Sequence, residues 1–180
     1  MAYIFDTNIF IRSKNEMPMD IWPTFWARFK EMVNSGHIFS SVMVKDEIDK
    51  GKDELTEWVK SNAPKSFFLS LDADVMSHYT ATQNWASSNP LYNQQALNTF
   101  ANVADAYLVA TAAAKQMTLV TYEASSPFSK KRIMIPDACN ALGVRYCDLN
   151  TVLKEMGIKI LHQTLSVIGH SLAFIEIFWL

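Results

Sequence analysis

The sequence is poor in the residues that mark fibrous, disulfide-bonded or unstructured proteins. Only 5 glycines and 6 prolines occur among 180 residues, which excludes collagen-like repeats and glycine-serine linkers. The two cysteines, Cys139 and Cys147, form neither a CxxC pair nor a four-ligand zinc pattern, so we expect reduced thiols in a cytoplasmic protein. Charged residues make up 19% and apolar residues 49%, a balance that excludes disorder. A chain of this length buries a sizeable core without disulfides.

The sequence also lacks an excess of positive charge. Its net charge is -2, so it has no strong basic field to attract nucleic acid, and acting on nucleic acid would require a metal ion for local positive charge. No basic stretch precedes Asp6, so we expect no secretory signal. The long uncharged run between Lys159 and Glu176 is interrupted by polar residues, whereas a membrane span needs about 20 predominantly apolar residues. We therefore expect no membrane span.

Short apolar runs alternate with amphipathic stretches along the chain. We expect strands at 3–5, 37–39, 67–69, 118–121, 133–135 and 144–146. We expect helices at about 21–33, 41–50, 53–62, 72–85, from 92, and at 101–116, 138–143 and 149–156, with a turn at 6–8. The aromatic residues of 21–33 share one helical face, which we interpret as core rather than a base-stacking strip. The alternation favours an α/β domain with a mainly parallel sheet.

The end of the chain, residues 158–180, has a different composition. It is rich in large apolar residues and would be insoluble if fully exposed. We expect this tail to form a helix that packs over the sheet or in a homodimer interface.

Asp6 and Asp105 stand out among the 18 acidic residues because of where they lie. Asp6 directly follows the first apolar run, and ligands of open α/β sheets bind at the carboxyl ends of strands. A turn-forming or capping role explains Asp6 equally well. Asp105 has Leu108 and Val109 at i+3 and i+4, which places it on the apolar face of a helix. Because a buried charge is costly and the next base is Lys115, we favour a functional site over a buried ion pair.

Three further acids occupy comparable places. Glu47 follows Val44 by three residues and Met43 by four, a spacing that places it on the inner face of a helix. Glu123 stands just beyond the expected strand at 118–121. Asp137 follows the next apolar run, although it also fits the N-cap of the following helix. Asn8 and Thr121 lie beside these acids and are expected to support a ligand oxygen or a water.

Carboxylates gathered at one sheet edge repel one another unless they take up protons or bind a cation. At 4 Å and an effective dielectric near 20, each like-charged pair costs about 4 kcal/mol. An all-oxygen ligand set suits Mg²⁺ or Mn²⁺ rather than Zn²⁺. Such an ion activates a water and stabilises the charge that develops when a phosphodiester is hydrolysed.

Four fragments of the sequence resemble the PIN-domain nucleases, including VapC-like toxins. They are Tyr3-Ile4-Phe5-Asp6-Thr7-Asn8, Ser41-Val42-Met43-Val44-Lys45-Asp46-Glu47-Ile48, Asp105-Ala106-Tyr107-Leu108-Val109-Ala110-Thr111-Ala112 and Leu119-Val120-Thr121-Tyr122-Glu123. By this resemblance, Asp6, Glu47 and Asp105 take the places of the family's metal-binding acids. Glu123 stands where the family usually has Asp, and we expect it to complete the metal shell or orient the water. Asn8 matches a position that supports the first Asp.

The resemblance implies a three-layer α/β/α PIN-like domain over residues 1–157 with a mainly parallel central sheet. It also implies an endoribonuclease that uses Mg²⁺ or Mn²⁺, of the kind found as the toxin of a type II toxin–antitoxin pair. The implied partners are an RNA substrate and a cognate antitoxin. The basic run Lys130, Lys131 and Arg132 is a candidate for contacts with phosphates, and a solvated charge run explains it at least as well.

Two other interpretations stay open. A haloacid-dehalogenase-like phosphatase would use Asp6 as nucleophile, but such enzymes normally carry a second Asp two residues later, where this chain has Asn8. A non-catalytic PIN-like scaffold that binds a protein or nucleic acid is compatible with Glu123 and the near-neutral charge. Titration with Mn²⁺ separates a scaffold from a nuclease.

Overall fold

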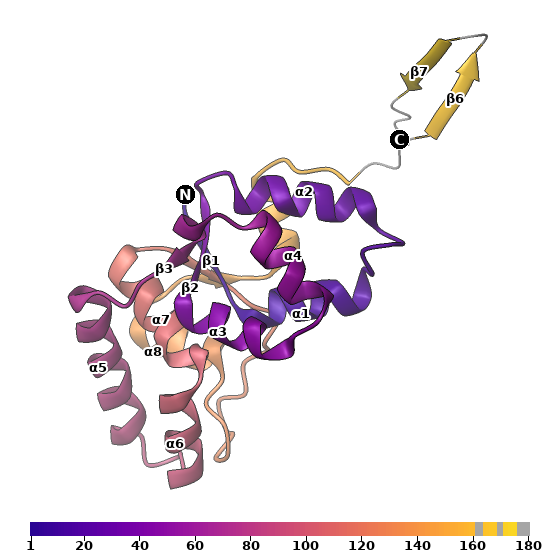
Figure 1. Ribbon diagram of the computed structural model, residues 1–180. Helices are drawn as coiled ribbons and strands as arrows, with labels where there is room; N and C mark the ends of the chain where they lie inside the picture. The colour runs from indigo at the N-terminus through magenta and orange to yellow at the C-terminus, as the bar shows by residue number, and fades with distance from the viewer. Residues whose placement is uncertain (161–163, 169–170, 176–180) are drawn as a thin grey trace.

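A five-stranded parallel sheet forms the centre of the computed structural model (Figure 1). In spatial order its strands are β3 (Phe68–Leu69), β2 (Ile38–Ser41), β1 (Tyr3–Phe5), β4 (Thr118–Val120) and β5 (Tyr146–Cys147). The structure describes residues 1–160, 164–168 and 171–175. Within these residues both cysteines are free thiols, as expected.

Helices connect the strands and lie on both faces of the sheet (Figure 1). They are α1 (Thr7–Glu16), α2 (Pro23–Val33), α3 (Val42–Gly51), α4 (Glu54–Asn62), the short 3-10 helix η1 (Lys65–Phe67), α5 (Ala73–Ser88), α6 (Gln94–Asn102), α7 (Ala104–Lys115), α8 (Ile135–Leu142) and α9 (Leu149–Glu155). The central helix α7 contacts β1, β2 and β4, and α5 packs against α7. The predicted three-layer α/β/α fold is confirmed.

The strand order locates the place where a ligand would bind. The chain moves outward from β1 through β2 to β3, and then returns past β1 to β4 and β5. Because parallel crossovers are right-handed, this reversal puts the helices between β1 and β3 on one face and those between β3 and β5 on the other. The reversal makes the gap between the carboxyl ends of β1 and β4 a topological switch point, where open α/β sheets bind ligands.

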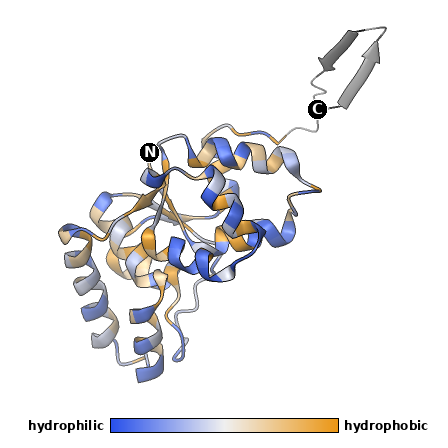
Figure 2. Ribbon diagram, viewed as in Figure 1, coloured by the Kyte–Doolittle hydropathy of each residue, from blue (hydrophilic) through white to orange (hydrophobic). Residues whose placement is uncertain are grey.

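The core surrounds β1 and β4, whose residues are all buried. Such continuous apolar runs are typical of parallel strands covered on both faces, and Figure 2 shows the hydrophobic residues concentrated in the strands and the helix faces against them. Aromatic rings from α1 and α2 fill one side: Phe29 stacks on Phe5 at 6.0 Å and meets Phe10 edge-on at 5.6 Å. The aromatic face of α2 is core, as interpreted, although Trp22 before it is 46% exposed.

The turn predicted at residues 6–8 is wrong, because α1 begins at Thr7 directly after β1. Asp6 has an extended backbone and is the N-cap residue of this helix. Only a few positions of α1 are buried, among them Ile9 and Phe10, and the remaining residues are mostly polar. With so few apolar residues, the ten residues of α1 show no clear helical periodicity.

The strand predicted at residues 133–135 is also wrong. Ile135 is the first residue of α8, and Pro136 follows it in the first turn, where its fixed φ favours helix initiation. Met134 is therefore the N-cap residue, and the capping role considered for Asp137 is not seen. The preference of proline for the first turn of a helix also explains why α2 starts at Pro23 rather than at the predicted Ile21.

The other helix predictions are confirmed with shifted ends. The alanine-rich helix α7 starts at Ala104 rather than at Ala101, because Val103 is extended and separates it from α6. In the tail, β6 (Thr164–Ile168) and β7 (Ser171–Ile175) pair antiparallel, so the helix expected there is wrong. The packing or dimer contact expected of the tail lies outside the described residues.

Candidate metal-binding pocket

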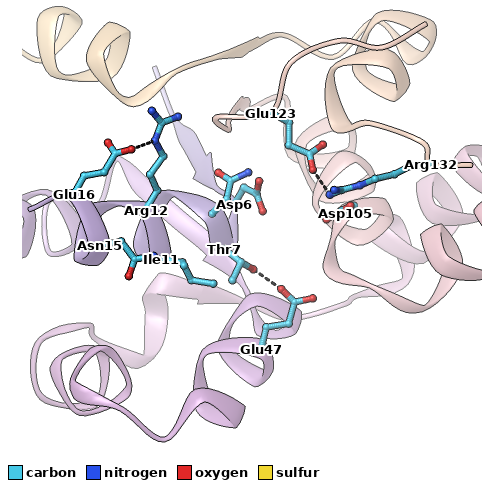
Figure 3. Close-up of a pocket in the computed structure, with 11 residues that line it drawn as sticks. Asp6, Thr7, Ile11, Arg12, Asn15, Glu16, Glu47, Asp105, Glu123 and Arg132 are labelled. Carbon is cyan, nitrogen blue, oxygen red and sulfur yellow. Dashed lines mark hydrogen bonds and ion pairs between the residues drawn. The ribbon is translucent and has the colours of Figure 1, made fainter. Parts of the chain in front are cut away.

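An acidic pocket lies at the switch point, over the carboxyl ends of β1 and β4 (Figure 3). Its volume is about 390 Å³, within the range of small-ligand sites. The lining residues are Asp6, Thr7, Asn8, Ile11, Arg12, Asn15, Glu16, Glu47, Asp105, Glu123 and Arg132. The fold therefore brings the four predicted acids together from segments that are up to 117 residues apart (123 − 6).

Asp6 lies at the floor of the pocket and is only 3% exposed. Its backbone N–H donates to Val120 O at 3.0 Å, which fixes it beside β4, and the hydroxyl of Thr121 donates to its Oδ2 at 2.8 Å. Burial raises the pKa of Asp6 to about 7, against the opposing effect of the Thr121 hydrogen bond, and the negative charge of Glu123 raises it further. The carboxylate of Asp6 is therefore held at a place where its negative charge is poorly compensated.

Asp105 occupies the first turn of α7 and points into the same pocket (Figure 3). Burial raises its pKa to about 7, and the charges of Asp6 and Glu123 add to this effect. Arg132 acts in the opposite direction, but it does not offset the rise. Since Glu123 raises the pKa of both aspartates and Asp6 raises that of Asp105, the three acids share one electrostatic environment.

Glu47 reaches the pocket from α3 and ties three helices together. Its Oε2 accepts a hydrogen bond from the hydroxyl of Thr7 at the start of α1. Its Oε1 accepts from the backbone N–H of Ala104 at 3.1 Å, at the start of α7. Glu47 therefore sets the spacing between the helix that follows Asp6 and the helix that carries Asp105.

Glu123 lies just beyond β4, and both of its carboxylate oxygens have partners. Arg132 forms an ion pair with Oε1, and the backbone N–H of Ile135 donates to Oε2 at 2.8 Å. In Figure 3 the Glu123 side chain points toward Arg132, which lies beside Asp105. Glu123 thus joins the end of β4 to the start of α8, and its expected role as a metal ligand stays a prediction.

Asn8 and Thr121 form a small network behind Asp6. The Asn8 amide donates to Thr121 Oγ1 at 3.0 Å and accepts from the N–H of Tyr122 at 3.1 Å. The backbone N–H of Glu123 also donates to Thr121 Oγ1, at 3.0 Å. With two donors directed at it, the Thr121 hydroxyl gives its own proton to Asp6. The network holds the Asp6 carboxylate in one orientation, and it gives Asn8 a structural amide role rather than that of a phosphatase acid.

The remaining predicted residues lie apart from the acids. Asp137 is buried and accepts from the Ser125 hydroxyl and from the Ser126 N–H at 3.0 Å, so it anchors the loop before α8 rather than lining the pocket. Lys130 and Lys131 are exposed in that loop. Of the basic run, Arg132 alone lines the pocket.

Of the pocket residues contributed by α1, the sequence analysis predicts Asn8 alone, because the start of that helix is interpreted there as a turn. Arg12 forms an ion pair with Glu16 one turn later, and its guanidinium lies 4.4 Å from the ring centroid of Tyr122. Asn15 completes this wall. The i,i+4 spacing of Arg12 and Glu16 was the available signal for a helix with a polar face at the site.

The donors of this pocket suit a hard divalent cation. Carboxylates, hydroxyls and amides are oxygen ligands, and Asp6 and Asp105 form no ion pair within the part of the chain that the structure describes. As the side chains stand, no three acids, histidines or cysteines among the described residues meet closely enough to enclose an ion. Binding an ion would therefore require the acidic side chains of the pocket to move closer together.

A family model and solved structures are similar to this chain. The model of one family, "Domain of unknown function (DUF4411)", matches residues 3–160. A chain of the VapBC2 crystal structure from Rickettsia felis, bound to a DNA fragment from their promoter, is similar with a TM-score of 0.52 and 16% identity, covering 82% of this chain and 98% of that one. FitAcB from Neisseria gonorrhoeae is similar with a TM-score of 0.48 and 16% identity, covering 80% of this chain and 95% of that one. A search of curated proteins gave no match.

The predicted PIN-like fold is confirmed. Among the described helices, none is long and apolar enough to cross a membrane.

Proposed function

The chain belongs to the DUF4411 family, and from this premise and its PIN-like fold we propose that it is a metal-dependent endoribonuclease. One observation carries the proposal: Asp6, Glu47, Asp105 and Glu123 line one pocket at the switch point of the sheet. Asp6 and Asp105 are the acids whose charge the described residues compensate least. A divalent cation would supply the missing compensation.

Asp6 and Asp105 would hold the Mg²⁺ or Mn²⁺, with Glu47 as the third acid. A bound ion of this kind supplies an activated water and neutralises charge on a phosphodiester. Thr121 and Asn8 keep the Asp6 carboxylate in place through their hydrogen bonds. Thr7 and the N–H of Ala104 orient Glu47. The start of α7 adds a favourable dipole for the negative charge of Asp105.

The proposal extends to a partner. The structurally similar VapBC2 chain belongs to a crystal structure that contains both components and a DNA fragment from their promoter. We accordingly assign this chain to the toxin side of a type II toxin–antitoxin pair, with RNA as the substrate, the cytoplasm as its location and an antitoxin as the protein that controls it.

A second candidate function is a PIN-like scaffold that binds a partner without cutting. The observation in its favour is Glu123, whose two oxygens already accept from Arg132 and from the Ile135 N–H. These contacts give Glu123 a structural role that needs no metal.

RNA cleavage by the purified chain tests the proposal. We expect cleavage with Mn²⁺ or Mg²⁺ that stops when EDTA is added. Asp6→Asn preserves the shape and removes a ligand charge, so activity should fall at least about a hundredfold, because losing several kcal/mol of metal-based stabilisation costs tenfold per 1.36 kcal/mol.

The matched control is Glu155→Gln, which also neutralises one carboxylate but lies at the opposite end of the sheet beside Tyr3. Its activity should equal that of the unmodified chain. Cleavage that survives both EDTA and Asp6→Asn would refute the proposal, whereas binding of RNA without any cleavage would favour the scaffold.

A further inference from the structure

The loop between β4 and α8, residues 123–134, carries features that the acidic pocket does not use. Phe128 is 87% exposed, more than any other large apolar side chain of the described residues. Lys130 and Lys131 follow it and are exposed too, and Arg132 ends the basic run. A protein with a net charge of -2 thus places three consecutive cations and a fully exposed aromatic ring in one short segment.

This loop is fastened at its base by two acids. Glu123 at its start accepts from the N–H of Ile135 at its end, and Asp137 in α8 accepts from the Ser125 hydroxyl and the Ser126 N–H. Since both ends of the loop are held by side-chain hydrogen bonds, its base has a defined position at the pocket, which Glu123 and Arg132 line. An exposed Phe on such a loop has no stabilising role in the folded chain.

Hydrogen bonds within the loop and to its neighbour add to this order. The N–H of Ser129 donates to Ser126 O at 2.9 Å, and the N–H of Arg132 donates to Ser129 Oγ at 3.3 Å. The N–H of Asn93, at the start of α6, donates to Lys130 O at 3.0 Å. In Figure 1 the loop, drawn in orange, extends beside α6. The segment that carries Phe128 is therefore ordered both by hydrogen bonds within the loop and by the hydrogen bond from Asn93.

Arg132 joins this loop to the acidic centre. It lines the pocket, pairs with Glu123 and lowers the pKa of Asp105 through its charge. Its side chain is 58% exposed, whereas that of Glu123 is 10% exposed. The ion pair with Glu123 therefore holds the Arg132 guanidinium at the edge of the pocket. The solvent-exposed part of this guanidinium is free to contact an anion.

We propose that the 123–134 loop is a binding arm for single-stranded RNA, in which Phe128 stacks on a base and Arg132 contacts a phosphate beside the acidic pocket. This inference rests on the proposed function and adds the strand form of its substrate. An exposed aromatic ring next to cations is the arrangement that proteins use to hold unpaired strands, because a base offers its face to the ring only when it is unpaired. Glu123 is then a positioning residue for Arg132.

The test measures binding of a short, end-labelled single-stranded RNA to the full chain by fluorescence anisotropy, in EDTA so that no strand is cut. Phe128→Ala should weaken binding about tenfold, because stacking on one base is worth roughly 1–3 kcal/mol. Phe128→Tyr should restore the affinity. Trp22→Ala is the matched control, since Trp22 is an exposed aromatic residue outside the pocket and the loop, and its affinity should not change.

Salt dependence tests the cations separately. Arg132→Gln should reduce the slope of log affinity against log salt by about 0.7, the value for one phosphate contact on a single strand. Arg28→Gln removes the same charge from an exposed i,i+3 ion pair on α2 and should leave the slope unchanged. The same RNA annealed to its complement should bind more weakly and should not respond to Phe128→Ala.

The outcomes separate this inference from the proposed function. Phe128-dependent RNA binding without metal-dependent cleavage would refute only the nuclease. Cleavage with an unchanged KM in Phe128→Ala would refute only the binding arm. The arm is also refuted if the unmodified chain binds no single-stranded RNA, or prefers the duplex. Because Phe128 is exposed, its variants should unfold at the same temperature as the unmodified chain, which a melting curve verifies.

Discussion

The two ends of the central sheet carry cavities of similar size and opposite chemistry. At the carboxyl end, the acidic pocket of about 390 Å³ contains Asp6 and Asp105, whose pKa values burial raises to about 7. At the amino end, a cavity of about 440 Å³ is lined by Arg145 and Glu155 among others. There the hydroxyl of Tyr3 donates to Glu155, and burial together with this bond raises the pKa of Tyr3 to about 12.

The comparison shows that cavity size does not mark the functional end of this sheet. The acid at the amino end has a fixed hydrogen-bond donor and a nearby arginine, so nothing further is needed to stabilise it. At the carboxyl end, Asp6 is buried and Asp105 is half-buried, both lie next to other acids, and neither forms an ion pair within the described residues. A folded chain bears such a cost where a cation or a proton is expected to bind.

The largest expected effect is on the pH dependence of stability. A pKa of about 7 in the folded state and 3.8 in the unfolded state means that the folded state binds more protons between these values. The contribution of Asp6 to stability is therefore fully present below its unfolded pKa of 3.8 and is lost as the pH rises from there through 7, by about 4 kcal/mol. Asp6→Asn removes this loss, so without metal the variant should be more stable than the unmodified chain at about pH 8 by up to this amount.

Thermal unfolding in EDTA across this pH range checks the prediction. For a chain of this size the gain corresponds to a rise in Tm of roughly 10 °C. At a pH well below 3.8, where Asp6 is protonated in both states, the two proteins should melt together. If Tm depended on pH in the same way for Asp6→Asn and the unmodified chain, the folded chain would not disfavour ionised Asp6. The carboxyl end of the sheet would then not differ from the amino end in holding a poorly compensated acid.

A smaller effect is expected at the amino end. Tyr3→Phe removes the hydroxyl that donates to Glu155 and keeps the buried ring, so the free energy of unfolding should fall by about 1 kcal/mol, because water solvates the exposed Glu155 in place of the lost donor. RNA cleavage should remain unchanged. Urea unfolding and a cleavage assay of the same preparation measure both, and a loss of cleavage at unchanged stability would mean that the amino end takes part in the activity.

The sequence predicted the sheet and the acids for physical reasons that can be stated. Strands such as Tyr3–Phe5 are continuous apolar runs, and the acids that follow them are visible because polarity changes abruptly. Asp105 was found because a charge on the apolar face of a helix is rare. That Glu47 and Asp105, which lie in helices, would share a pocket with Asp6 was implied by the resemblance to the PIN-domain nucleases and not by the order of the strands.

The rest depended on contacts between distant segments. The helix α1 was missed because its polar residues face the pocket and its buried positions are few. The pairing of Glu123 with Arg132 joins residues nine apart across a loop whose path no local pattern specifies. The exposed Phe128 is indistinguishable in sequence from a core Phe until the loop around it is placed.

Calorimetric titration of Mn²⁺ into the full chain tests the central claim most directly. At about pH 7, in two buffers of different ionisation enthalpy, we expect binding that releases on the order of one proton, because a carboxyl group with a pKa near 7 must ionise to become a ligand. Asp105→Asn should abolish the binding and Glu155→Gln should preserve it. Absence of binding by the unmodified chain, or equal binding by Asp105→Asn, would contradict the account.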